Sequence, residues 1–83
     1  MNIKRIGQNM TEVSANGLKL FFSYETPVAG WNCEGAFKTD QYYSRTTTKH
    51  INQYLDGHDA KIVSQKYCDV AYENLDIKIA NEG

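Results

Sequence analysis

The dipeptide Asn16-Gly17 is the feature that most constrains how this chain can fold. Both residue types tolerate a positive φ, which the tight turn of a two-residue β-hairpin requires. Apolar and polar side chains alternate over residues 18–24, as they do in a strand with one buried face. Phe21 interrupts the alternation, so we expect this strand to be covered on both faces. Residues 11–24 are therefore predicted to form a β-hairpin.

Two more strands are expected to follow the hairpin. Pro27 has no N–H for a strand ladder, so it can only start a strand or lie on an edge. Residues 28–33 and residues 36–39 carry the strand pattern, with a turn at Glu34-Gly35 between them. The expected sheet is thus an antiparallel meander of three or four strands.

Residues 42–55, "YYSRTTTKHINQYL", combine hydroxyl, basic and aromatic side chains, but their spacing is that of a helix start. The apolar face repeats at i, i+4 and i+8, which is the helical period. Because a threonine hydroxyl can accept an N–H of the first turn, Thr46 or Thr47 is predicted as the N-cap. Gly57 is predicted as the left-handed residue that ends the helix. The residues of the buried face are expected to be Thr47, Ile51 and Leu55, with Tyr54 beside them.

The remaining residues predict a second helix. The short apolar segment 60–65 fits either a strand or an extended link, and Ser64 can cap a helix over residues 65–75. Residues 76–83 fit either an edge strand through Ile77 and Ile79 or a fraying end. We therefore expect one α+β domain over residues 1–83, with an ordered core at about 11–75. In it, a three- to four-stranded antiparallel meander packs against two short helices.

No motif in the chain indicates catalysis. His50 with Tyr54 could be interpreted as a base near hydroxyl groups, but no orienting acid or G-x-S-x-G turn accompanies them. Two cysteines and two histidines would suffice for one metal site, yet no pair has the close spacing of zinc ligands. These four residues are Cys33, Cys68, His50 and His58. We expect no enzyme activity, no metal and no cofactor.

Charge and hydropathy limit the classes of function that remain. Nine Lys and Arg against ten Asp and Glu give a net charge of −1, unlike the basic excess of most nucleic-acid-binding proteins. No apolar run reaches the ~18 residues of a membrane span, and no secretory leader is present, so a cytoplasmic protein with reduced, buried cysteines is expected. A nucleic-acid surface stays open as an alternative, built from Lys38, Arg45 and Lys49 with nearby Trp31, Tyr42 and Tyr43.

Aromatic side chains favour a protein partner. Tyrosine, tryptophan and arginine are enriched at the energetic centres of protein–protein interfaces. Six Tyr, three Phe and one Trp in 83 residues exceed what a small core needs, so some are expected outside. Acidic residues gather in the last third of the chain and could face a basic partner. The predicted partner-binding residues are Trp31, Tyr42, Tyr43, Arg45, Lys49, Asp69 and Glu73.

Two sequence blocks stand out, "SYETPVA" at residues 23–29 and "KTDQYYSRTTTKHIN" at residues 38–52. Together they resemble a family of small uncharacterised proteins of tailed bacteriophages. The family pattern has SYxTPVA in the first block and YSxTTSKHIN in the second. Thr48 stands here where the family has serine, and the turn at residues 32–35 is particular to this chain. The resemblance covers about residues 12–75.

The resemblance implies a phage origin and action in the host cytoplasm, without assigning an activity. On it we base the hypothesis of a small protein that inhibits a host defence complex by masking a protein surface. An anti-CRISPR protein that blocks a CRISPR effector would act in this way. The alternatives are a nucleic-acid-binding accessory protein and a component of the virion or its assembly.

Overall fold

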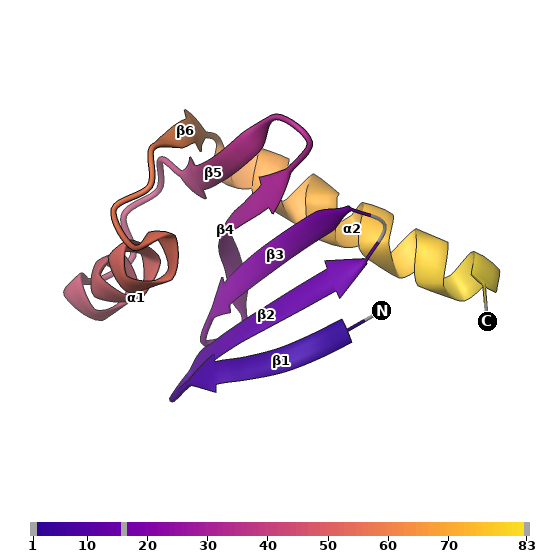
Figure 1. Ribbon diagram of the computed structural model, residues 1–83, viewed down its shortest axis with the longest axis horizontal. Coiled ribbons are helices and arrows are strands. Elements are labelled where there is room, and N and C mark those ends of the chain that lie inside the picture. The colour runs from indigo at the N-terminus through magenta and orange to yellow at the C-terminus, as the bar shows by residue number, and fades with distance from the viewer. Residues whose placement is uncertain (1, 16, 83) are drawn as a thin grey trace.

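Across the described residues, six strands form one sheet in the order β1-β2-β3-β4-β5-β6, and two helices accompany it (Figure 1). The computed structural model describes residues 2–15 and 17–82, with side chains as far as Leu75. The elements in chain order are β1 (Asn2–Gly7), β2 (Met10–Ala15), β3 (Leu18–Ser23), β4 (Thr26–Asn32), β5 (Gly35–Thr39), α1 (Arg45–Leu55), β6 (Ala60–Val63) and α2 (Gln65–Glu82).

The predicted hairpin is present as β2 and β3. Ala15 pairs with Leu18 across the turn, and Gly17 has a φ of 80°, as the tight turn requires. Asn16, the other turn residue, lies outside the described residues. Phe21 is buried on the sheet face opposite to Leu20 and Phe22, so β3 is covered on both faces as expected.

The α+β class is confirmed, but the described sheet has six strands, more than the three to four that the sequence predicted. Strand β1 lies before the expected core and pairs antiparallel with β2. A register shift between Arg5 and Gly7 breaks the two-residue period, so Ile3 and Ile6 stand three apart. Because neither face of β1 is buried, its sequence lacks the apolar–polar alternation that indicates a half-buried strand.

The second added strand is β6, for which the sequence had allowed either a strand or a link. Helix α1 carries the chain back along the sheet, so β6 runs parallel to β5 and the sheet is not a pure meander. The pairing places Ala60 beside Ala36 and Val63 beside Thr39. A parallel neighbour depends on this crossover, which no local pattern encodes.

Helix α2 continues to Glu82, so an edge strand through Ile77 and Ile79 is wrong. The two isoleucines alternate as in a strand. However, no glycine or proline interrupts residues 65–82, and the helix that Ser64 precedes therefore runs on. Gly83 lies outside the described residues.

The two helices cover opposite faces of the sheet and divide the core into two clusters. Toward α2 lie Leu20, Phe22, Phe37, Val63, Cys68 and Leu75. Toward α1 lie Phe21, Val28, Ala29, Ala36, Ile51 and Leu55. Strands β3, β4 and β5 are therefore the centre of the molecule, while β1 is exposed along most of its length.

Candidate functional site

The outer face of α1 carries a surface hollow with aromatic and basic side chains, hereafter the α1 hollow. Tyr42, 66% exposed, stands at its edge, and Arg45 and Lys49 lie one helical turn apart on the same exposed face. Its volume is about 560 Å³, and its lining residues are Tyr42, Arg45, Thr48, Lys49, Asn52, Gln53, Asp56 and Gly57. The hollow thus brings together three of the predicted partner-binding residues.

The N-terminal end of α1 differs from the prediction. Ser44, not Thr46 or Thr47, is the N-cap, because its Oγ accepts the N–H of Thr47 at 3.1 Å. At the other end Asp56 is the first residue in the left-handed region, with a φ of 48°, and Gly57 follows at 79°. No acidic residue stands in the first turn, so no carboxylate offsets the positive end of the helix dipole beside Arg45, whereas Asp56 places one carboxylate at the other end of the hollow.

The inner face of α1 is fixed to the sheet by a buried polar contact. The hydroxyl of Ser23 lies 2.8 Å from Nδ1 of His50, and it donates to Oγ1 of Thr47 at 3.2 Å. Ser23 is 2% exposed and ends β3, while Thr47 and His50 lie one turn apart on α1. Because hydrogen bonds are directional, this contact sets the rotation of α1 and so the direction that the hollow faces.

The Ser23–His50 pair was missed from the sequence, which suggested only Tyr54 and nearby hydroxyl groups as neighbours of His50. The two residues stand 27 positions apart, and the available signal was that one lies in each of the two motif blocks. A serine with histidine is the beginning of a nucleophile–base pair. Here the hydroxyl is buried in the helix–sheet contact, so the arrangement positions α1 and leaves no access for a substrate.

The adjacent residues Tyr42 and Tyr43 lie in different surroundings. Tyr42 lines the hollow, whereas Tyr43 lies near the start of α2, where its pKa is raised by burial and by the negative charge of Asp69. Tyr43 is still 44% exposed. Tyr43 and Asp69 are therefore close enough to interact electrostatically, and Glu73 is exposed one helical turn further along α2.

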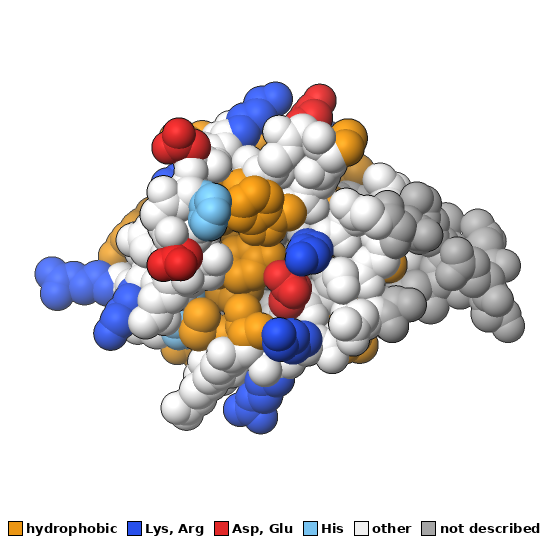
Figure 2. Space-filling view, viewed as in Figure 1, with side chains coloured by type: hydrophobic (Ala, Val, Ile, Leu, Met, Phe, Trp, Pro, Cys, Tyr) orange, Lys and Arg blue, Asp and Glu red, His pale blue; other side chains and the backbone are white. Residues whose placement is uncertain are grey.

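Trp31 belongs to a different groove. It pairs with Ala36 near the start of β5, whereas Tyr42 follows the end of that strand, so the two aromatics do not form one patch. Figure 2 shows a hydrophobic strip on this side of the molecule, with charged side chains next to it. The Trp31 groove has a volume of about 510 Å³ and is lined by Glu12, Ser14, Ala15, Gly17, Leu18, Lys19, Trp31 and Tyr54.

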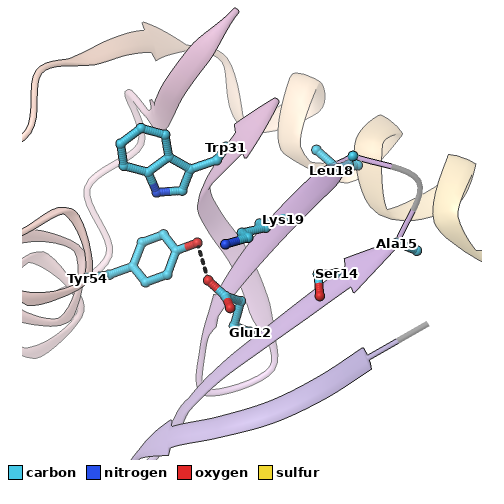
Figure 3. A pocket seen from close by; sticks show the side chains of 8 residues that line it. Glu12, Ser14, Ala15, Leu18, Lys19, Trp31 and Tyr54 are labelled. Carbon is cyan, nitrogen blue, oxygen red and sulfur yellow. Dashed lines mark hydrogen bonds between the residues drawn. The ribbon is translucent and has the colours of Figure 1, made fainter. Parts of the chain in front are cut away.

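Tyr54 connects the Trp31 groove to the core. Its hydroxyl donates to Oε2 of Glu12 at 2.7 Å, and its ring stacks on Phe21 with centroids 4.3 Å apart (Figure 3). Burial, followed by the hydrogen bond to Glu12, raises the pKa of Tyr54, so the hydroxyl stays a donor. Trp31 stands edge-on to His58 with centroids 5.3 Å apart. These contacts hold the groove walls in place.

The other residues that the sequence suggested for binding or metal coordination lie apart from one another. Lys38 lies on β5 between Ala29 and Ile62 and does not line the α1 hollow. Cys68 is buried as expected, but Cys33 is exposed, because it follows β4 in the turn to β5. Among the described residues, no group of three or more His, Cys, Asp or Glu side chains could hold a metal ion.

Neither helix offers, within its described residues, a stretch both long and apolar enough to cross a membrane.

Comparison with known proteins gives one match. The chain belongs to a family of unknown function (DUF8033), whose model matches residues 1–70. This region contains all six strands, α1 and the first residues of α2. No curated protein and no solved structure matches the chain.

Proposed function

We propose that the protein is a phage-encoded binding protein that acts in the host cytoplasm by covering a surface of a host protein complex. A defence complex such as a CRISPR effector is the preferred target class. The phage origin rests on the resemblance of the two motif blocks, and the mode of action rests on the exposed side chains.

The observation that carries the proposal is the composition of the α1 hollow. Tyr42 is two-thirds exposed beside Arg45 and Lys49, and tyrosine and arginine are among the residue types enriched at interface hot spots. The buried Ser23–His50 contact holds the helix that carries them. A preorganised surface loses less conformational entropy on binding, which suits a protein that inhibits by occupancy.

The test is retention of a host complex by the tagged protein and by a double variant, Tyr42→Ala with Arg45→Ala. We expect one complex to be retained by the wild type through a high-salt wash and lost by the double variant. Addition of the pure protein should then inhibit that complex. Lys4→Ala, at an exposed cation on β1, is the matched control. Retention that is equal for wild type and double variant, or no retained protein, would contradict the proposal.

A nucleic-acid-binding function is the second candidate, and the same hollow favours it. Arg45 and Lys49 could each contact a phosphate while Tyr42 stacks on a base. Two phosphate contacts on a single strand predict about sevenfold weaker binding between roughly 50 and 200 mM salt. Fluorescence anisotropy with labelled oligothymidine measures this, and absence of binding at low salt excludes the candidate.

A further inference from the structure

The Trp31 groove combines an aromatic wall with a carboxylate and an ammonium group, and it shares no lining residue with the α1 hollow. Trp31 pairs with Lys19 across β4 and β3, and Lys19 pairs with Ser14 across β3 and β2, so these side chains form a row on the α1 face of the sheet. Glu12 stands two residues before Ser14 on β2 and points to the same face. Figure 3 shows Tyr54 reaching from α1 toward Glu12, with Trp31 and Lys19 beside them.

The polar groups of this groove have capacity for a ligand. The hydroxyl of Tyr54 donates to Oε2 of Glu12 at 2.7 Å and takes one of the about four positions at which a carboxylate can accept. Both oxygens of Glu12 therefore keep room for further donors. Lys19 is exposed, and its ammonium group has three N–H donors. Because Lys19 repels a cationic ligand and Glu12 an anionic one, the groove favours a neutral, planar group that has both donors and acceptors.

Among the nucleobases, guanine matches this set of groups best. Its Watson–Crick edge has two adjacent donors, N1–H and the 2-amino group, which a carboxylate can accept as a bidentate pair, and the neighbouring O6 accepts from an ammonium group. Adenine and cytosine each place an acceptor where the carboxylate needs a donor, and uracil has one donor between two acceptors. All bases have a flat face that stacks on an aromatic ring, so the edge, and not the face, selects guanine.

We propose that the Trp31 groove binds the guanine base of a nucleotide. The base stacks on Trp31, its N1–H and 2-amino group donate to Glu12, and its O6 accepts from Lys19. The groove has a volume of about 510 Å³ and holds the base, while the sugar and the phosphate extend into solvent. A free nucleotide and a guanine within a single strand present the same edge and face. The inference does not depend on the proposed function, because it concerns a different surface.

The test uses the fluorescence of Trp31, which is the one tryptophan of the chain, so that quenching reports on this groove alone. The pure, full-length chain is titrated with the monophosphates of guanosine, inosine and adenosine. We expect saturable quenching by guanosine monophosphate. Inosine monophosphate lacks the 2-amino group and should bind about tenfold more weakly, because Glu12 loses one hydrogen bond. Glu12→Gln keeps an acceptor for Tyr54 but should remove this preference, because its amide N–H groups meet the donors of the base.

Lys19→Met should also weaken binding of guanosine monophosphate, whereas Glu34→Gln, at an exposed carboxylate outside the groove, is the matched control and should bind as the wild type does. If Glu12→Gln does not fold, as judged by circular dichroism, the preference of the wild type and the Lys19→Met variant still decide the outcome.

A heptanucleotide with one central guanine among thymines, compared with heptathymidine, separates the two sources of the base. Tighter binding of the guanine strand than of guanosine monophosphate assigns the site to single strands, and the reverse order assigns it to free nucleotides. Equal affinity for the three monophosphates, or a preference that survives Glu12→Gln, would overturn the assignment of guanine. Absence of quenching by guanosine monophosphate and by the guanine strand would overturn the site itself.

Discussion

Both helices pack on the sheet through an apolar cluster and are hydrogen-bonded to it, but the hydrogen bonds differ in how deeply they are buried. On the α2 face an apolar cluster contains Phe37, Leu20 and Cys68. Asn32 donates a hydrogen bond to the hydroxyl of Tyr67, and Gln65 donates one to the carbonyl of Pro27, at the exposed or half-buried edge of this face. The α1 face has an apolar cluster too, but hydrogen bonds from Ser23 to α1 and from Tyr54 to the sheet cross its boundary. Apolar packing contributes stability without a preferred direction, whereas hydrogen bonds also fix orientation.

This difference corresponds to what each helix exposes. Helix α1 presents the α1 hollow, whose side chains must face one direction to bind a partner. Helix α2 exposes Val70, while the ring of its Tyr67 packs edge-on against Phe37 and the hydroxyl of Tyr67 accepts a hydrogen bond from Asn32. We infer that the buried hydrogen bonds of Ser23 help to orient α1, while the apolar clusters on both faces supply most of the stability.

The largest loss of stability is expected from Phe37→Ala, which removes the ring at the centre of the α2 face. Phe37 is 2% exposed, so the variant loses buried apolar area and leaves a cavity, at a cost of about 3–5 kcal/mol. Urea unfolding measures the loss, and Tyr42→Ala, at an exposed position, should change stability by less than about 0.5 kcal/mol. A similar effect of the two variants would contradict the central role of the α2 face.

Gly30→Ala tests the same face by adding an atom. A Cβ at Gly30 would meet the carbonyl oxygen of Lys19 and lie 2.6 Å from Cζ of Phe37. Because the carbonyl belongs to a neighbouring strand, we expect a destabilisation of about 3 kcal/mol. Combining the change with Phe37→Leu should recover only part of that loss. Full recovery would show that the ring, and not the strand, is the obstacle.

Ser23→Ala tests whether the buried contact of Ser23 orients α1 or only stabilises the fold. The change leaves Thr47 and His50 without their buried partner, at an expected cost of about 1–3 kcal/mol. Hydrogen exchange should accelerate at the amides of α1 more than at those of α2. Ser14→Ala, at a half-buried serine on β2, is the control. Equal acceleration in both helices would mean that the contact stabilises the whole fold without orienting α1.

The smallest expected effect is a pH dependence of the stability, caused by the Cys68 thiol on the α2 face. Burial, followed by the charges of Asp69 and Asp40, raises the pKa of Cys68 from its ordinary value of 9.0 to about 11. Between these values the folded state holds a proton that the unfolded state has released, so stability decreases as pH rises from 9.0 toward about 11. Below 9.0 the thiol contributes no pH dependence.

Urea unfolding curves of the wild type and Cys68→Ala are compared on both sides of pH 9.0. The comparison isolates the contribution of the Cys68 thiol, because the other titrating groups are common to both proteins. The variant should lose less stability than the wild type as the pH rises. Parallel curves would indicate that the thiol titrates normally in the folded protein.

Much of the secondary structure was predictable because its signals are local. The Asn16-Gly17 turn, the face of Thr47, Ile51 and Leu55, and the helix after Ser64 each depend on residues a few positions apart. Three of the predicted binding residues did meet in the α1 hollow, because Tyr42 lies next to α1 and Arg45 and Lys49 are one turn apart within it. Strand β1 escaped prediction because neither of its faces is buried, so no apolar–polar alternation marks it.

The sequence by itself determined the class of the fold, the position of α1 and the start of α2, and the side chains that α1 exposes. Only the tertiary structure decided that β6 runs parallel to β5, that Ser23 meets His50, and that Trp31 lies apart from Tyr42. Periodicity reports which face of an element is apolar, because that depends on neighbours along the chain. Which elements meet depends on how distant apolar faces are buried together, and that is a property of the whole packed chain.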